Sequence, residues 1–217
     1  MVGCISFLFC GLFGRNKSSS VAILGLSGTG KTKLAYFLHS GSLLETCTSV
    51  NINRLSCHPD PRNSRTVDLI DVPSHMNASL DTLSKDISAV ATIVVLLTPG
   101  LAASTAGTGM NDTVQLVARL LTMTTRKTRI FLGVNDDSDP GATVTALETA
   151  MTDHYRRRQQ AGMKDSSGQA EEGVFLLPGQ AFSFEKHASC PVTFGRVSIP
   201  RTAVREELDI STLMPQL

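Results

Sequence analysis

The sequence predicts a three-layer α/β domain in which a mainly parallel sheet is covered by helices on both faces. Apolar runs of strand length alternate with stretches whose apolar residues recur every three or four positions, the pattern of strands alternating with helices. A glycine-rich loop joins the first strand to the first helix, and ligands of such domains bind at the edge where parallel strands end. The 217 residues suffice for one domain. We expect that domain at residues 18–217 and a separate hydrophobic segment at residues 1–17.

The composition is that of a folded globular protein, with 41% hydrophobic and 18% charged residues. The net charge of +1 gives no basic excess, so we expect no direct nucleic-acid partner. The five cysteines are odd in number and show no C-x-x-C spacing. This indicates reduced thiols rather than a disulfide or zinc framework.

The first thirteen residues, Met1–Phe13, are almost all apolar and are followed by Arg15 and Lys17. As a helix they would reach about 20 Å, less than the roughly 30 Å of a bilayer core. Three interpretations stay open: an interfacial or acylated anchor using Cys4 or Cys10, a transmembrane segment whose beginning is missing, or a leader packed on the domain. Because the basic residues suit a cytoplasmic face, we expect membrane attachment with the domain on the cytoplasmic side.

Residues Gly25–Thr32 match G-x-x-x-x-G-K-[ST], the P-loop pattern, after the apolar strand Val21–Leu24. A helical stripe follows the loop, and Gly41 can end that helix. The glycines let successive N–H groups point at one anion, and the positive end of the helix dipole adds to them. Lys31 adds a full charge, and the Thr32 hydroxyl is placed to bind Mg²⁺. The expected nucleotide-binding residues here are Gly25, Ser27, Gly28, Thr29, Gly30, Lys31 and Thr32.

Two apolar stretches continue the sheet after a polar connection at Ser42–Pro61. The first is Val67–Val72, in which Asp71 stands at the C-terminal end, where P-loop proteins place an acid near magnesium. The second is Ala89–Leu97, an uninterrupted buried strand.

The second half of the chain continues the alternation of helices and strands. Asp139 can cap a helix that starts at Pro140, and Arg156–Arg158 suit the C-terminus of that helix. The expected elements are a helix at Asn111–Met123, a strand at Thr128–Val134, a flexible insertion at Gln159–Gly173, a strand at Pro191–Ser198 and a short helix from Asp209.

This order of motifs is that of a small Ras-like GTPase, and three stretches narrow the resemblance. Ala22–Thr32, Thr46–Val50 and Leu69–His75 resemble the beta subunit of the signal recognition particle receptor, which typically reads GLSGSGKT, T-x-T-S-I and D-[LV]-P-G-H. That family also begins with a hydrophobic membrane anchor. The resemblance starts at Val21 and continues faintly to the end of the chain.

The resemblance implies a protein that uses GTP and Mg²⁺ at the endoplasmic reticulum membrane. In that family the GTP-bound beta subunit holds the N-terminal domain of the receptor's alpha subunit. Ribosomes that carry secretory and membrane proteins are thereby brought to the membrane. The expected partner of this chain is therefore the alpha subunit.

The resemblance also assigns roles in the switch loops. The Thr48 hydroxyl would reach Mg²⁺ in the first switch, and Asp71 would hold the ion through water. His75 would stand where other GTPases orient the attacking water, which makes it the catalytic candidate. The backbone N–H of Ser74 can meet the γ-phosphate, but serine replaces the family's glycine and restricts the backbone. We therefore expect slow or absent intrinsic hydrolysis.

The guanine-reading motif N-K-x-D is only partly present, as Asn135-Asp136-Asp137-Ser138. The resemblance makes Asn135 a base-binding candidate, and Asp137 or Asp139 could accept the guanine hydrogens if the loop shifts by one residue. An equally weighted interpretation takes the acidic cluster as the N-cap at Asp139 with solvated neighbours. Ser198 remains a candidate from the reduced S-A-K element.

Two other functions stay open. An Arf-like or other trafficking GTPase would be favoured by a myristoylated N-terminus, but Met1-Val2-Gly3 has no glycine in second position. A P-loop kinase or ATPase would need an arginine-rich lid, for which Arg156–Arg158 is the one candidate.

Overall fold

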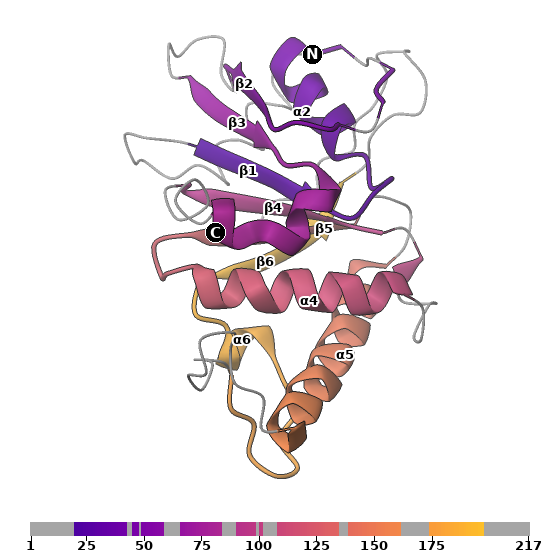
Figure 1. Ribbon diagram of the computed structural model, residues 1–217, viewed down its shortest axis with the longest axis vertical. Coiled ribbons are helices and arrows are strands. Elements are labelled where there is room, and N and C mark those ends of the chain that lie inside the picture. The colour runs from indigo at the N-terminus through magenta and orange to yellow at the C-terminus, as the bar shows by residue number, and fades with distance from the viewer. Residues whose placement is uncertain are drawn as a thin grey trace.

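Six strands form one sheet in the order β2-β3-β1-β4-β5-β6, as the computed structural model shows (Figure 1). All neighbouring strands are parallel except β2 and β3, which are antiparallel. The strands are β1 Ser20–Gly25, β2 Asn53–Cys57, β3 Val67–Asp71, β4 Thr92–Leu97, β5 Arg129–Val134 and β6 Val192–Arg196. The structure describes residues 20–42, 45–47, 49–58, 66–83, 90–98, 100–101, 108–134, 139–161 and 174–197.

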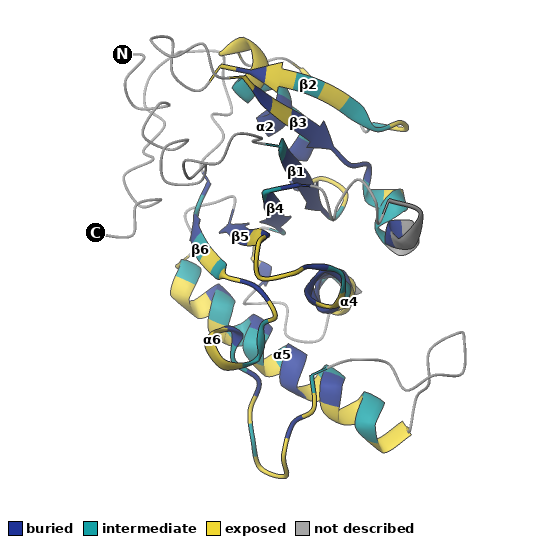
Figure 2. Ribbon diagram, turned by 90° about the vertical axis from the view of Figure 1, so that its left-hand side faces the viewer, coloured by how far each residue is buried: buried dark blue, intermediate teal, exposed yellow. Residues whose placement is uncertain are grey.

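Helices cover both faces of the sheet. The central strand β1 sends alternate side chains to the two sides: Ile23 packs in a cluster with Leu34, whereas Leu24 packs in a cluster with Val117 and Leu147. Strands β1, β3, β4 and β5 are accordingly mostly buried, whereas the outer strands β2 and β6 are partly exposed (Figure 2). The predicted three-layer fold with a mainly parallel sheet is confirmed. The helices are α2 Lys31–Ser40, α4 Thr108–Met123, α5 Pro140–Ala161, the short α6 Phe184–His187 and the 3₁₀ segment η1 Ser74–Leu83.

The predicted helix ends are visible in the backbone. Gly41 follows α2 in the left-handed region, with φ of 68°, and its N–H donates to the carbonyl of Phe37 at 2.8 Å. Asp139 caps α5, since its two carboxylate oxygens accept hydrogen bonds from the N–H groups of Gly141 and Ala142 at 3.0 and 3.2 Å. The capping interpretation of Asp139 is confirmed. The helix continues three residues beyond Arg158, to Ala161.

Strand β2 lies where the sequence predicted only a polar connection. Its side chains alternate, because Arg54 and Ser56 are exposed whereas Leu55 is partly buried and Cys57 is buried. It is an outer strand of the sheet and joins β3 on one side. A short strand with polar residues at Asn53, Arg54 and Ser56 lacks the continuous apolar run of a central strand, which is why the prediction was wrong.

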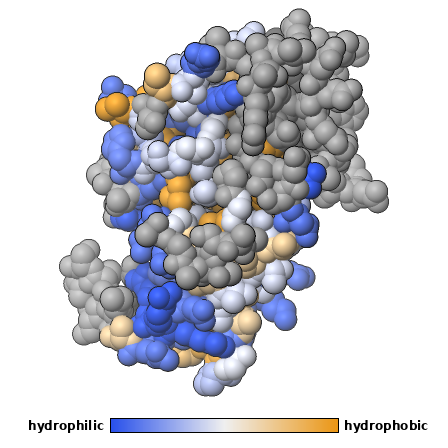
Figure 3. Space-filling model, turned by 90° about the vertical axis from the view of Figure 1, so that its right-hand side faces the viewer, coloured by the Kyte–Doolittle hydropathy of each residue, from blue (hydrophilic) through white to orange (hydrophobic). Residues whose placement is uncertain are grey.

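The described surface is mixed in character. Hydrophilic side chains gather over the lower part of the molecule in Figure 3. Among the described residues, Val50, Phe175 and Leu177 are large hydrophobic side chains that are exposed. Val50 lies between α2 and β2, on the stretch that also carries Ser49. One exposed apolar side chain therefore lies on the loop that precedes β2.

Several expectations fall outside the described residues. They concern the N-terminal segment 1–17, most of the insertion predicted at 159–173 and the helix predicted from Asp209. The domain limits that we expect from the sequence therefore stay predictions. In the parts of the chain that are described, no helix combines the length and the apolar character needed to cross a bilayer.

Candidate functional site

The loop between β1 and α2 has the shape that a phosphate cradle needs. Gly28 and Gly30 adopt positive φ angles of 78° and 84°, which turn successive backbone N–H groups toward the same side. Gly25 has no room for a side chain, since a Cβ there would lie 2.4 Å from the carbonyl oxygen of Leu96. Because α2 begins directly after the loop, its free N–H groups face the same edge of the sheet.

Lys31 is held inside this loop with only 7% of its surface exposed. Its Nζ donates to the carbonyl of Leu26 at 2.8 Å, and the hydroxyl of the fully buried Thr29 donates to the same carbonyl at 2.9 Å. Burial lowers the pKa of Lys31, and the charge of Asp71 partly offsets this effect. A buried cation that is hydrogen-bonded to a carbonyl rather than to a carboxylate favours the arrival of an anion.

A cluster of oxygen atoms surrounds the buried carboxylate of Asp71 at the end of β3. Its Oδ2 accepts hydrogen bonds from Thr32 Oγ1 at 2.9 Å, Ser49 Oγ at 3.2 Å and Asn53 Nδ2 at 2.9 Å. Its Oδ1 is buried and has no hydrogen-bond partner. An unpartnered carboxylate oxygen beside two hydroxyls fits Mg²⁺, which prefers oxygen and takes its other ligands from phosphates and water.

As a metal site, this cluster would contain a single carboxylate, that of Asp71. Among the described residues there is no group of three or more His, Cys, Asp or Glu side chains that could hold a metal ion. The cluster around Asp71 therefore suits a cation that arrives with phosphate oxygens better than a metal held by protein alone.

The segment after β3 is tied to the phosphate loop by a residue that the sequence analysis missed. Asn77, in η1, donates from Nδ2 to the carbonyl of Gly25 at 3.0 Å, and its Oδ1 is buried without a partner. Ser74 begins η1 and is partly buried, and His75 follows it with an exposed side chain. The structure thus brings the start of η1 to the loop through Asn77.

Ser27 is an exposed residue of the phosphate loop. Four other predicted site residues are not among the described ones. Thr48 lies outside them, as do Asn135, Asp137 and Ser198. The chain is described up to Val134, the last residue of β5, and resumes at Asp139. Because β1, β4 and β5 are parallel, their C-terminal ends share one edge of the sheet. Strand β5 therefore ends at the same edge of the sheet as the phosphate loop.

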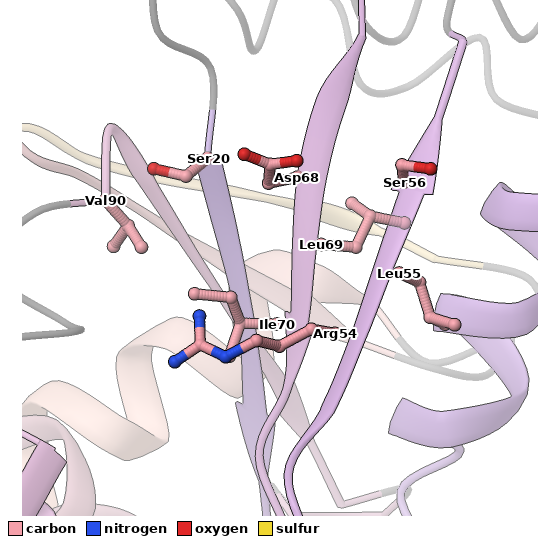
Figure 4. Close-up of a pocket in the computed structure, with 8 residues that line it drawn as sticks. All are labelled: Ser20, Arg54, Leu55, Ser56, Asp68, Leu69, Ile70 and Val90. Atoms are coloured by element: carbon pink, nitrogen blue, oxygen red, sulfur yellow. The ribbon is translucent and has the colours of Figure 1, made fainter.

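Two hollows lie near β2. One, of about 280 Å³, adjoins the oxygen cluster, and its lining includes Thr32, Ser49 and Asn53. Cys47, which is exposed and has a free thiol, also lines it. The larger, of about 480 Å³, opens over β1, β2 and β3 (Figure 4) and is lined by Arg54 and Asp68. It reaches Ser20, the first residue of β1, so it lies at the end of that strand opposite the phosphate loop.

Comparison by sequence finds no relative. No protein-family model matches the chain. A search of curated proteins gives no significant match either.

Comparison by structure does find relatives in fold. The structure of the mammalian SRP receptor matches with a TM-score of 0.64 and 20% sequence identity, covering 82% of this chain and 90% of that chain. The receptor SRb-GTP/SRX complex from Chaetomium thermophilum matches with a TM-score of 0.60 and 16% identity, covering 88% and 96%. The SRb-GDP structure from the same organism matches with a TM-score of 0.55 and 17% identity, covering 88% and 96%.

These matches span nearly the whole of each receptor chain, so they concern the complete domain and not only the phosphate loop. The fold agrees with the family that the motifs of the sequence resemble. The chain therefore has the P-loop GTPase fold of the signal recognition particle receptor structures.

Proposed function

We propose that the chain is a GTP-binding beta subunit of a signal recognition particle receptor. The observation that carries this proposal is the unpartnered Oδ1 of Asp71 beside Thr32, at the mouth of a phosphate loop that holds a buried lysine. The motifs quoted above and the fold support it. The neighbouring structures include SRb with GTP, with GDP, and with GDP and Mg.

The proposed division of labour starts at the phosphates. The backbone N–H groups of the loop bind the β- and γ-phosphates, and Lys31 contributes its charge. Thr32 and Asp71 hold Mg²⁺, which neutralises the phosphate charge, and Thr48 joins them when the first switch is ordered. Asn135, Asp137 and Ser198 bind the guanine base.

Hydrolysis is proposed to be slow or absent. His75 is the residue assigned to the attacking water, and its side chain is exposed. Ser74 restricts the backbone where the receptor family has glycine. Nucleotide therefore serves to build a binding surface rather than to drive a rapid cycle.

The proposed partner is the receptor's alpha subunit, bound in the GTP state. One neighbouring structure is SRb-GTP with SRX. The exposed apolar side chain of Val50, next to Ser49 of the oxygen cluster, offers a contact that changes when nucleotide orders this loop. Residues 1–17 are proposed to attach the protein to the endoplasmic reticulum membrane, with the domain on its cytoplasmic side.

The test is a side-by-side measurement of affinity for GTP, GDP and ATP by the full chain. We expect GTP and GDP to bind more tightly than ATP, and Lys31→Ala to weaken GTP binding by at least about 10-fold through loss of a charged hydrogen bond. Lys33→Ala, two residues further along the first turn of α2, is the matched control and should bind like the wild type.

Equal affinity for ATP and GTP would overturn the guanine-specific proposal. Rapid single-turnover hydrolysis of GTP by the same preparation would overturn the proposal of a slow GTPase. Melting curves of both lysine variants establish that each is folded.

A further inference from the structure

Asn53 occupies a special place between the outer strand and the carboxylate of Asp71. It is the first residue of β2, and in the antiparallel ladder it stands directly opposite Asp71. Its Nδ2 donates to Asp71 Oδ2 at 2.9 Å and to Ser49 Oγ at 3.0 Å. One amide group thus holds both the carboxylate and a hydroxyl of the oxygen cluster.

The cluster has more polar contacts than hydrogens to fill them. Thr32, Ser49, Asn53 and Asp71 make five contacts of 2.9–3.2 Å. The two hydroxyls supply one hydrogen each and the amide supplies two, which makes four. At least one pair of oxygen atoms therefore lies at hydrogen-bond distance with no hydrogen between them. A cation would relieve that repulsion, because it binds lone pairs.

The four groups differ in what they can do for such a cation. The hydroxyl oxygens of Thr32 and Ser49 have lone pairs that can coordinate Mg²⁺, and so has Asp71. The amide nitrogen of Asn53 has none and can only donate hydrogen bonds. The hydrogen bonds that Asn53 donates to Asp71 and Ser49 can therefore persist when Mg²⁺ binds, whereas the hydrogen bonds between the hydroxyls and the carboxylate must change.

We propose that Asn53 is a positioning residue of the magnesium site. By holding Oδ2 of Asp71 it leaves Oδ1, the buried oxygen without a partner, for Mg²⁺ or its water shell. By holding Ser49 it brings a second hydroxyl beside that of Thr32. The position of the outer strand β2 is thereby coupled to occupancy of the metal site. This inference rests on the proposed binding of nucleotide with magnesium.

The test measures how release of a fluorescent GDP, mant-GDP, from the full chain depends on free Mg²⁺. We expect Asn53→Ala to raise the Mg²⁺ concentration that half-maximally slows release by about 10-fold, the usual effect of losing a group that orients a metal ligand. Asn51→Ala is the matched control, because Asn51 is exposed and lies two residues away on the same chain segment. It should keep the wild-type midpoint.

A second variant gives a signature that a structural role would not produce. Asn53→Asp places another carboxylate beside Asp71, so in EDTA its melting temperature should fall below that of Asn53→Ala. With a saturating excess of GDP present throughout, added Mg²⁺ should restore the melting temperature more for Asn53→Asp than for Asn53→Ala. This comparison uses stability rather than nucleotide release, and the excess of GDP keeps it informative if one variant binds mant-GDP less tightly.

The outcomes separate this inference from the function on which it rests. If wild-type release of mant-GDP does not respond to Mg²⁺, the proposed function fails and Asn53 has no magnesium site to position. If the wild type responds but Asn53→Ala keeps its midpoint, the inference alone is overturned. A loss of stability that is equal with and without Mg²⁺ in both variants would also overturn it, since Asn53 would then only join β2 to β3.

Discussion

At the scale of single residues, the three described cysteines differ in what their thiols can do. Cys47 is exposed beside the oxygen cluster, whereas Cys57 and Cys190 are buried. Burial, together with the charge of Asp68, raises the pKa of Cys57 to about 12. Burial also raises the pKa of Cys190. Since the thiolate is the reactive form, the two buried thiols are protected both by access and by protonation.

This difference predicts one fast-reacting thiol in the native domain. In a Cys4→Ser, Cys10→Ser background at pH 8, the disulfide reagent DTNB should modify Cys47 quickly and the other two cysteines only on unfolding. Adding Cys47→Ser should abolish the fast phase. Modification of Cys57 in the native state, at a rate near that of Cys47, would contradict the prediction.

His154 on α5 is the described histidine whose protonation the fold opposes. Its Nε2 is buried without a hydrogen-bond partner. Burial, and after it the charges of Arg158 and Arg157, lower the pKa of His154. The unfolded chain has a histidine pKa of about 6.5 and so binds this proton more readily than the folded chain. The folded protein therefore keeps its full stability above about pH 6.5, where His154 is neutral in both states. It loses stability as the pH falls from there through the lower pKa that His154 has in the folded chain.

The prediction is a change in how stability depends on pH. Between pH 7.5 and pH 5, wild-type protein should lose more free energy of unfolding than His154→Gln, which has no ionisable group at this position. Urea unfolding at both pH values measures the difference, and carboxylates that titrate in both proteins cancel from it. Equal losses in the two proteins would show that His154 does not contribute.

At the scale of the element, α5 carries threonines that bond to its own backbone. The hydroxyls of Thr145, Thr149 and Thr152 each donate to the carbonyl four residues earlier. Thr145 and Thr149 are exposed, whereas Thr152 is buried and its Oγ1 also accepts the backbone N–H of Phe182 at 2.8 Å. Threonine therefore has two roles in α5. Thr145 and Thr149 are surface residues of modest helix propensity, whereas Thr152 accepts a hydrogen bond from a buried backbone N–H group.

These two roles predict effects of different size for the same substitution of threonine by valine. Thr152→Val keeps the shape but leaves the N–H of Phe182 without an acceptor, which should lower the free energy of unfolding by about 1–3 kcal/mol. Thr149→Val, the exposed control on the same helix, should change it by less than about 0.5 kcal/mol. Urea denaturation of both variants measures the difference. Similar values for the two would mean that the hydrogen bond from Phe182 to Thr152 does not contribute to stability.

Elements were predictable where the physics that forms them is local in sequence. Strands β1, β4 and β5 are buried on both faces, so each appears as a continuous apolar run. The phosphate loop is likewise complete within eight residues, Gly25–Thr32. Strand β2 was missed because polar residues alternate along its exposed face, and α6 was missed because four residues carry no helical period.

The site was predictable only in part for the same reason. Asp71 ends an apolar strand and follows the loop in the expected order, so its position has a sequence signal. Asn53 and Asn77 have none, because they reach the site through pairing of β2 with β3 and through contact of η1 with the loop. Both are products of tertiary structure, which the spacing of residues along the chain does not record.

At the scale of the whole molecule, the sheet lies between two hydrophobic cores, and elements that pack on either core meet at one edge of the sheet. One core contains α2 and the other contains α4 and α5, and alternate residues of β1 and β4 belong to each. The loop after β1, the end of β3 and the start of η1 meet at the carboxyl edge through the contacts of Asp71 and Asn77. A ligand bound there contacts elements from both sides of the sheet, so its binding energy stabilises the entire domain.

The place of β2 at the outside of the sheet also bears on how copies of the protein behave in concentrated solution. Within the described chain, β3 is its one neighbouring strand, so its other side presents a row of backbone groups. Such an edge can accept a strand from another molecule and begin an aggregate. The strand has only five residues, and Arg54 and Ser56 point polar side chains to the exterior. The polarity that concealed this strand in the sequence is thus a safeguard of colloidal solubility, which apolar substitutions at those two positions would remove.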